Sequence, residues 1–158
     1  MKERALTKRP VTGFCECVSV IGPLLGGGHS ILQGLHGFSA DNLVSARLVL
    51  ANGSAITSSA EKNPDLFWAI RGAGHNFGVV TSFEVKLYDA KETWTMIVFT
   101  FKQDKLEGFF NTWNRLEVKH VGLGSLVLNG VFVRNPAIDT DYVGCPLFLL
   151  YFGVFKKM

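Results

Sequence analysis

Three consecutive glycines, Gly26, Gly27 and Gly28, are the residues best suited by type and spacing to form a ligand site. A glycine has no Cβ atom, so backbone N–H groups there can approach a phosphate closely and adopt positive φ. Phosphate or dinucleotide binding is therefore one interpretation of the triplet. A tight turn beside a buried helix is the other, and the residues alone leave both open.

The common nucleotide-binding signatures fit neither this triplet nor the later glycine cluster at 72–78. A Walker loop requires G-x-x-x-x-G-K-[ST], and no such Lys-Ser or Lys-Thr pair follows the glycines. The dinucleotide fingerprint G-x-G-x-x-G has Ile31 in place of its third glycine. The later cluster misses the fingerprint by one residue and precedes a predicted strand, whereas Rossmann glycines precede a helix. Rossmann and P-loop proteins are therefore excluded.

Cysteine and histidine residues offer a second kind of chemistry. Cys15, Cys17, His29 and His36 are metal-ligand types, but C-x-C with H-x₆-H does not match the usual zinc spacings, so no metal site is predicted. No catalytic-cysteine signature surrounds Cys15 or Cys17. With Cys145 the cysteine count is odd, so it does not define a closed disulfide framework or a redox compartment.

A β-hairpin is predicted between the two glycine clusters. The run at 43–50 alternates and is rich in aliphatic and β-branched residues, and the run at 54–59 can form its partner strand. Asn52-Gly53 between them is a strong hairpin-turn signal, because both residues tolerate positive φ. The sequence therefore predicts an antiparallel pair over 43–59.

A short helix is predicted after the hairpin. Asn63-Pro64-Asp65 supplies an N-cap, a proline at the first helical position and an acidic first turn. The helix should run to about Arg71, with Gly72 as the glycine just beyond its end. Phe67 and Trp68 are expected to pack against the core, and Arg71 to cap the helix end or form a salt bridge.

The rest of the chain is predicted as strands and one further helix. A long strand should cover about 78–88, with one face formed by Val79, Thr81, Phe83, Val85 and Leu87. After the polar stretch 89–93, a strand, an amphipathic helix and two strands should follow at 94–101, 104–119, 125–134 and 146–155. The inward stripe of that helix is expected to consist of Leu106, Phe109, Phe110, Trp113 and Leu116. This order suggests the start of a second α+β unit with an antiparallel sheet.

Composition and charge exclude several classes of protein. The 158 residues are 47% hydrophobic and 18% charged, which is enough apolar material for a packed core and argues against disorder. Residues 1–10 carry the whole net charge of +3, because four basic side chains there face one acidic one and the rest of the chain is balanced. The basic face of a nucleic-acid binder is therefore missing. No apolar run approaches the roughly 18 residues of a membrane span, and no signal peptide is predicted.

Three segments together resemble a known family. They are FCECVSVIGPLLGGGHS, GFSADNLVSARLVLANGS and NPDLFWAIRGAGHNFGVVTSFEV, and they look like the second half of a flavin domain. The family is the FAD-linked oxidases with a PCMH-type FAD-binding domain, on the berberine-bridge-enzyme-like branch. The resemblance covers about residues 13–90 and is looser over 92–155. It implies an α+β chain with an unassigned segment at 1–12, part of the FAD-binding domain at 13–91 and part of a substrate domain with an antiparallel sheet at 92–158.

The resemblance implies FAD as the cofactor and Cys15 as a possible covalent attachment point. In that branch a cysteine in G-x-C-P-T-V-G, eleven residues before the glycine triplet, can bond to C6 of the flavin, and counting back from Gly26 reaches Cys15. The neighbours Glu16, Cys17 and Ser19 depart from the pattern, so attachment through Cys17 and a plain structural thiol remain alternatives. A thiolate is the competent nucleophile for such a bond. The implied cofactor-binding set is Cys15, Val18, Gly22, Pro23, Gly26, Gly27, Gly28, Gly78, Val79 and Val80.

Three residues of these segments have a competing interpretation. Val79 and Val80 would present backbone groups to the cofactor, but both also suit an ordinary strand core. His29 imitates the histidine of the family's R-x-G-G-H attachment motif, yet that motif belongs well before the cysteine segment. We therefore expect His29 to start a helix or to pack.

The resemblance implies an oxidoreductase that transfers hydride from a small organic substrate to flavin, with reoxidation by oxygen. Its partner would be a small molecule rather than a nucleic acid or a membrane, and the family is often secreted. The catalytic base lies outside the matched motifs, so no catalytic residue is nominated. The alternative is a truncated non-catalytic chain that cannot hold FAD alone and acts at most as an interaction module, because half a cofactor cleft exposes apolar surface.

Overall fold

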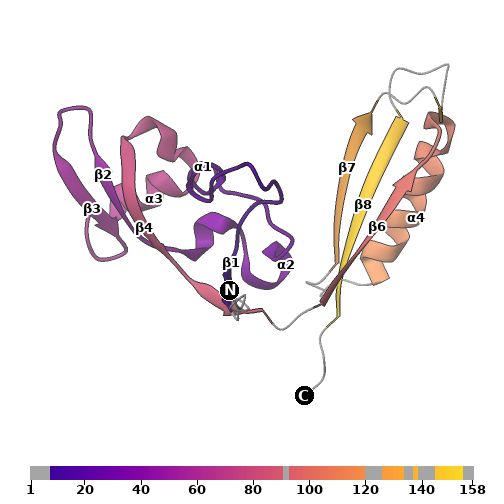
Figure 1. Ribbon diagram of the computed structural model, residues 1–158, viewed down its shortest axis with the longest axis horizontal. Helices are drawn as coiled ribbons and strands as arrows, with labels where there is room; N and C mark the ends of the chain where they lie inside the picture. The colour runs from indigo at the N-terminus through magenta and orange to yellow at the C-terminus, as the bar shows by residue number, and fades with distance from the viewer. Residues whose placement is uncertain (1–7, 91–92, 120–125, 134–136, 139–144, 155–158) are drawn as a thin grey trace, which may run out of the picture. The chain divides into compact units, whose positions relative to one another are not determined.

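The computed structural model describes residues 8–90, 93–119, 126–133, 137–138 and 145–154. The chain divides into two compact units, Met1–Lys91 and Glu92–Met158. Both contain helices and antiparallel strands, which confirms the predicted α+β class (Figure 1). Within the described ranges, no helix is both long and apolar enough to cross a membrane.

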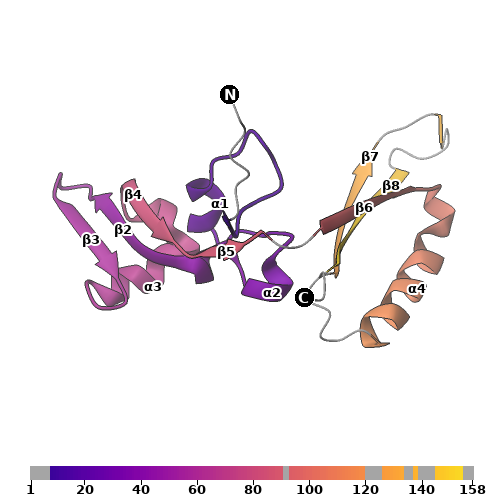
Figure 2. The ribbon, with the colours of Figure 1, turned by 60° about the horizontal axis from the view of Figure 1, so that its bottom comes forward.

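Residues 8–90 of the first unit form ten short elements. They are β1 (Lys8–Pro10), α1 (Ile21–Leu25), α2 (Gln33–His36), the 3₁₀ turn η1 (Ser39–Asn42), β2 (Leu43–Val49), β3 (Ala55–Ser59), α3 (Pro64–Ala73), the 3₁₀ turn η2 (Gly74–Asn76), β4 (Val79–Val85) and β5 (Leu87–Asp89). β3, β2 and β4 form an antiparallel sheet in that order, and β1 pairs with β5 in a separate two-stranded ribbon (Figure 2). In this ribbon Lys8 pairs with Asp89, and their side chains form a salt bridge of 2.5 Å.

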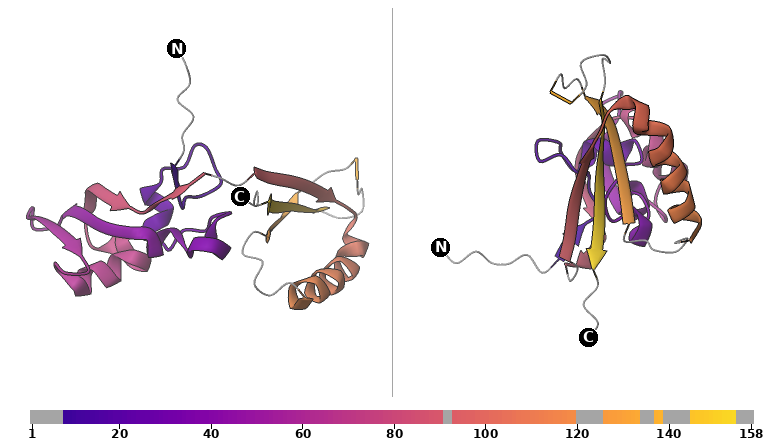
Figure 3. Two further views of the ribbon diagram at one scale, coloured as in Figure 1. Left: turned by 90° about the horizontal axis from the view of Figure 1, so that it is seen from below. Right: turned by 90° about the vertical axis from the view of Figure 1, so that its right-hand side faces the viewer.

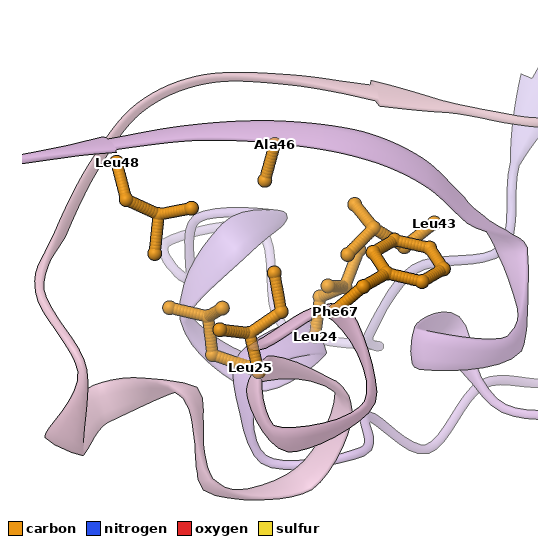
Figure 4. Close-up of a cluster of buried hydrophobic side chains, with 7 residues drawn as sticks. Leu24, Leu25, Leu43, Ala46, Leu48 and Phe67 are labelled. Atoms are coloured by element: carbon orange, nitrogen blue, oxygen red, sulfur yellow. The ribbon is translucent and has the colours of Figure 1, made fainter. Parts of the chain in front are cut away.

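The core of this unit lies between one face of the sheet and the helices α1 and α3. Leu24 and Leu25 come from α1, and Phe67 and Ile70 from α3; the cluster is completed from the strand β2 by Leu43, Ala46 and Leu48 (Figure 4). Leu24, Leu48 and Ile70 are fully buried. Burying a leucine or isoleucine side chain stabilises a fold by roughly 2 kcal/mol, so this cluster fixes α1 and α3 on the sheet.

The predicted hairpin at 43–59 is confirmed as β2 and β3. Leu50 donates its N–H to the Ser54 carbonyl and accepts the Gly53 N–H, both at 2.9 Å, which closes the connection. Gly53 has φ of +82°, as the Asn-Gly signal predicts. The turn residues therefore determine the register that brings Leu48 opposite Ile56.

The helix α3 begins at Pro64 as predicted, but both of its ends differ in detail. Asn63 adopts a left-handed conformation with φ of +54° and does not cap the helix with its side chain. Its amide instead donates to the Thr57 carbonyl at 2.8 Å, which ties the helix start to β3. The prediction that Gly72 ends the helix was wrong, because α3 continues to Ala73 and the tight turn starts at Gly74.

Gly74, rather than Gly72, is the glycine that packing requires. A Cβ atom at Gly74 would lie 2.5 Å from Leu25 Cδ2 and 3.0 Å from Leu25 Cβ, whereas a Cβ at Gly72 meets nothing within 4 Å. We expect Gly74→Ala to lower the free energy of unfolding by about 2 kcal/mol, because the buried Leu25 side chain must shift. Gly72→Ala, its matched control, should raise it by up to about 1 kcal/mol through helix propensity. Urea unfolding followed by circular dichroism measures both, and equal effects would contradict the assignment.

The single strand predicted at 78–88 was wrong in length, and its phase was wrong at Val79 and Thr81 but right at Val85, which packs on the core. Lys86 interrupts it by donating its N–H to the Asn42 carbonyl, and the two parts, β4 and β5, join different sheets. The pairing of β4 with β2 shifts between the partners of Arg47 and Leu48, which leaves Thr81 as an extra residue. A β-bulge of this kind reverses the alternation. Val80 therefore packs on the core, while Val79 is 70% exposed.

The second unit contains the strand–helix–strand–strand order that the sequence predicts. Its elements are β6 (Thr93–Thr100), the 3₁₀ turn η3 (Gln103–Lys105), α4 (Leu106–Lys119), β7 (Leu126–Val133) and β8 (Cys145–Val154). The antiparallel sheet has the order β6-β8-β7, and α4 lies along one side of it (Figure 3). Leu106, Phe109 and Trp113 are half-buried as expected, but Phe110 is exposed. Leu116 lies outside the residues whose side chains are described.

Candidate functional site

Cys15 lies at the start of an exposed turn that precedes α1. The Val18 N–H donates to the Cys15 carbonyl at 3.2 Å and closes the turn. Cys15, Cys17 and Val18 are all exposed, and neither cysteine is in a disulfide. Both thiols are therefore accessible to a bulky ligand, as covalent attachment would require.

The helix α1 joins this turn to the glycine triplet. Ser19 accepts the Gly22 N–H through its Oγ at 3.2 Å, so the serine that departs from the family pattern supports the first turn of the helix. Gly22 and Pro23 lie inside α1. Gly26 donates its N–H to the Pro23 carbonyl at 2.9 Å, which terminates the helix.

The glycine triplet forms a tight turn held by the segment around η1. Gly27 and Gly28 have φ of +102° and +74°, in the region that favours glycine. The Ala40 and Ser39 N–H groups donate to the Gly27 and Gly28 carbonyls, each at 2.9 Å. A Cβ at Gly27 would meet nothing within 4 Å, whereas one at Gly28 would lie 2.7 Å from Ser39. Gly27 is thus open to a ligand, while Gly28 is also required by internal packing.

Ser39 is a polar residue of this site for which the sequence carries no signal. It is 1% exposed, and within the described part of the chain its Oγ has no hydrogen-bond partner. A buried hydroxyl without a partner costs about 1–3 kcal/mol. It lies behind the turn, against Gly28, and is not exposed to a ligand.

The second glycine cluster lies beside the end of α1. Gly74 contacts Leu25, and a Cβ at Gly26 would lie 4.0 Å from His75 Nε2. The structure therefore brings together two segments that are almost 50 residues apart in the sequence. Sequence patterns did not indicate His75, because a lone histidine in a glycine-rich loop carries no spacing signal.

Gly78, Val79 and Val80 follow this loop at the start of β4. Gly78 has φ of +157°, and a Cβ there would overlap the Val49 carbonyl oxygen. Close approach of the protein's own backbone therefore explains this glycine. The side chain of Val79 is exposed, whereas that of Val80 packs on the core. The strand-core interpretation therefore holds for Val80 alone, and the predicted backbone contacts of both residues to the cofactor stay a prediction.

An open groove of about 410 Å³ runs along the outer side of α3. It is lined by Asp41, Trp68, Ala69, Arg71, Gly72, Ala73 and Phe77. The prediction that Trp68 packs inward was wrong, since its side chain is 76% exposed and only Phe67 enters the core. The Arg71 guanidinium lies 5.0 Å from the Phe67 ring centroid, a cation–π contact in place of the expected cap or salt bridge.

His29 contacts its own neighbourhood, as expected. Its Nδ1 lies 2.9 Å from Gln33 Oε1 at the start of α2, and its ring meets the Phe38 ring edge-to-face at 5.2 Å. It therefore helps to hold the loop between α1 and α2. Within the described residues, no group of three metal-ligating side chains occurs.

The arrangement suits a large ligand that carries both a ring system and phosphates. An accessible thiol precedes a helix, the helix ends in an open positive-φ turn, and an unpartnered hydroxyl lies beside that turn. The thiol is a possible covalent anchor and the turn a place for close backbone approach, whereas the Ser39 hydroxyl is buried behind the turn.

Comparison with known proteins gives the family. No family model matches the chain. The FAD-linked oxidoreductase OXR2 of Pyricularia oryzae is 52% identical over 133 residues, which are 82% of this chain and 26% of that protein. The chain thus spans about a quarter of the length of this relative.

Two solved structures share the fold. The berberine-bridge-enzyme-like protein 1 of Physcomitrella patens superposes with a TM-score of 0.74 at 26% identity, over 92% of this chain and 30% of that one. The glucooligosaccharide oxidase of Acremonium strictum, described as having a novel flavinylation, superposes with a TM-score of 0.73 at 26% identity, over 92% and 29%. The chain therefore belongs to the FAD-linked oxidases with a PCMH-type FAD-binding domain, on the berberine-bridge-enzyme-like branch.

Proposed function

We propose that this chain supplies part of the flavin site of an FAD-dependent oxidoreductase. Residues 13–91 would belong to the FAD-binding domain and residues 92–158 to the substrate domain. The observation that carries the proposal is the accessible Cys15, joined through α1 to the positive-φ turn at Gly27. The relative OXR2 is named an FAD-linked oxidoreductase, which supports the choice of cofactor.

The bound flavin would accept a hydride from a small organic substrate and pass the electrons on to oxygen. Cys15 would hold the ring system in place through its sulfur. Gly26 and Gly27 would contact the polar part of the cofactor, and the segment from Gly78 would supply backbone groups. The substrate class would be a carbohydrate or a secondary metabolite, as the named oligosaccharide oxidase illustrates for its own reaction.

The chain's exposed apolar surface favours one alternative function. Within the first unit, large side chains are exposed beside the candidate site, including Phe14, Val18, Phe38 and Phe77. Exposed apolar patches of this kind mark contact surfaces. A chain that cannot retain FAD alone would use this surface to bind a protein partner.

Flavin retention by the full chain separates the two functions. We expect protein expressed with added FAD to be yellow after gel filtration, with the absorption bands of an oxidised flavin at a ratio of one flavin per chain. A Gly27→Val variant should lose this absorption, because a branched side chain is strained at φ of +102° and fills the open space. Gly53→Val, at the tip of the β2–β3 hairpin with φ of +82° and a Cβ that also meets nothing within 4 Å, is the matched control and should retain it. A colourless, aggregating wild-type chain would contradict flavin binding and favour the alternative.

A further inference from the structure

The tip of the β2–β3 hairpin contains a sequence motif that has no role in the proposed flavin site. Asn52-Gly53-Ser54 matches N-x-[ST] with a residue other than proline in the middle, and it is the only such tripeptide among the 158 residues. This tripeptide is the acceptor sequence for N-linked oligosaccharide. The acceptor is used only where the side chain is on the surface.

The structure places this acceptor at an open position. All residues from Ala51 to Ala55 are exposed, and the loop projects beyond the end of the sheet (Figure 1). A Cβ built on Gly53 would meet nothing within 4 Å. Because Asn52 and its neighbours are exposed, a bulky group on its side chain can extend into solvent.

The hydrogen bonds of Asn52 leave the reacting atom available. Its Oδ1 accepts the Ser54 N–H at 3.0 Å and the Ser54 hydroxyl at 2.6 Å. No partner of Nδ2 is found among the residues that the structure describes. Since a glycosidic bond to Nδ2 leaves Oδ1 as an acceptor, the modified side chain keeps both contacts to Ser54.

We infer that Asn52 is an N-glycosylation site when the chain enters a secretory pathway. Nδ2 would form a bond to the anomeric carbon of an oligosaccharide carried on a lipid pyrophosphate. The bond between that carbon and the pyrophosphate oxygen would break, the lipid pyrophosphate would leave, and Nδ2 would release one proton. No electrons are transferred in this step.

The position also has a physical benefit for the sheet. β3 is the edge strand of the order β3-β2-β4, and its first residue, Ala55, follows the acceptor sequence directly. Unpaired edge strands invite pairing with other chains. A hydrated oligosaccharide at this end would obstruct such pairing.

Translation with microsomes tests the inference without any role for flavin. The full chain, placed behind a cleavable signal peptide, is translated in the presence of endoplasmic-reticulum membranes and analysed by gel mobility and mass. We expect one glycan per chain, which an enzyme that cleaves the amide bond between asparagine and the glycan should remove. Asn52→Gln and Ser54→Ala should lose the shift completely, and Ser54→Thr should retain it. Asn114→Gln, an exposed asparagine without the acceptor sequence, is the matched control and should also retain it.

Three results would overturn the inference. One is a translocated chain, shown by signal-peptide cleavage, that carries no glycan. A second is a shift that persists in Asn52→Gln. The third is an Asn52 peptide that contains only the small mass change of an amide converted to a carboxylate, since an Asn-Gly pair can lose its amide nitrogen spontaneously.

Discussion

A Cys15→Ser variant is expected to carry no covalently bound flavin, whereas Cys17→Ser retains the level of the unmodified chain. The two thiols are equally free of disulfide bonds and both are exposed, so accessibility alone does not distinguish them. Position does, because Cys15 lies eleven residues before Gly26, at the spacing of the family's attachment cysteine. A serine hydroxyl is a far weaker nucleophile than a thiolate and cannot replace it at neutral pH.

Mass measured after denaturation is the appropriate readout for this pair of variants. The full chain is expressed with FAD, denatured, and analysed for the added mass of one flavin and for flavin fluorescence in the protein band. Denaturation removes non-covalent flavin, so the denatured sample reports only covalent attachment. A variant that has lost the sulfur but still folds keeps the flavin absorption of the native sample, whereas a variant with a folding defect loses it. Covalent flavin that survives in Cys15→Ser but disappears in Cys17→Ser would assign the bond to the other sulfur. Its absence from the unmodified chain would contradict attachment altogether.

Gly78→Ala is expected to lower the free energy of unfolding of the first unit by about 4 kcal/mol. Two independent causes act at this position. The φ of +157° lies where only glycine is comfortable, and the new Cβ would overlap the Val49 carbonyl oxygen and lie 3.2 Å from its carbon. Since Val49 ends the strand β2, the backbone cannot move away without breaking the pairing of Val49 with Val79.

Gly53→Ala is the matched control for the strain of an alanine at positive φ without a close contact. Gly53 has φ of +82°, but a Cβ there meets nothing within 4 Å, so only the strain of a positive φ remains. That strain costs about 1 kcal/mol. Thermal and urea unfolding by circular dichroism measure both variants. Equal losses in the two would show that contact with Val49 contributes nothing.

Local signals were sufficient for most of the elements. The hairpin at β2 and β3 follows from alternation and Asn52-Gly53, and the start of α3 follows from Pro64, because these signals act within a few residues. The order of β6, α4, β7 and β8 was likewise predictable from hydrophobic periodicity. In each case the determinant lies inside the element that it determines.

Determinants that lie elsewhere in the chain were not predictable. Thr81 is an extra residue only in relation to Arg47 and Leu48, so the phase of β4 cannot be derived from its own alternation. Gly74 is required because Leu25 of another helix packs against it. The local sequence around 72–74 does not contain this contact, so it does not distinguish Gly74 from Gly72 as the end of the helix. Trp68 has the residue type of a core position, but the inner side of α3 is already occupied by Phe67 and Ile70.

The candidate site shows the same division. The glycine triplet and Cys15 could be selected from type and spacing, and they remain predictions as cofactor contacts. Ser39 and His75 could not be selected, because they reach the turn only through the fold. At Gly28 and Gly78 the close packing of the protein itself also requires a glycine, and a sequence motif does not reveal that requirement.

The ribbon of β1 and β5 has a mechanical consequence. Its outermost pair is Lys8 with Asp89, so the first residue of β1 and the last residue of β5 lie at the same end of an antiparallel pair. Tension applied between Lys8 and Asp89 would load the three residue pairs one after another, as in opening a zipper, rather than shearing them together. Such a short two-stranded ribbon is marginally stable. Under pulling it would therefore yield at low force, before the sheet that holds α1 and α3 bears any load.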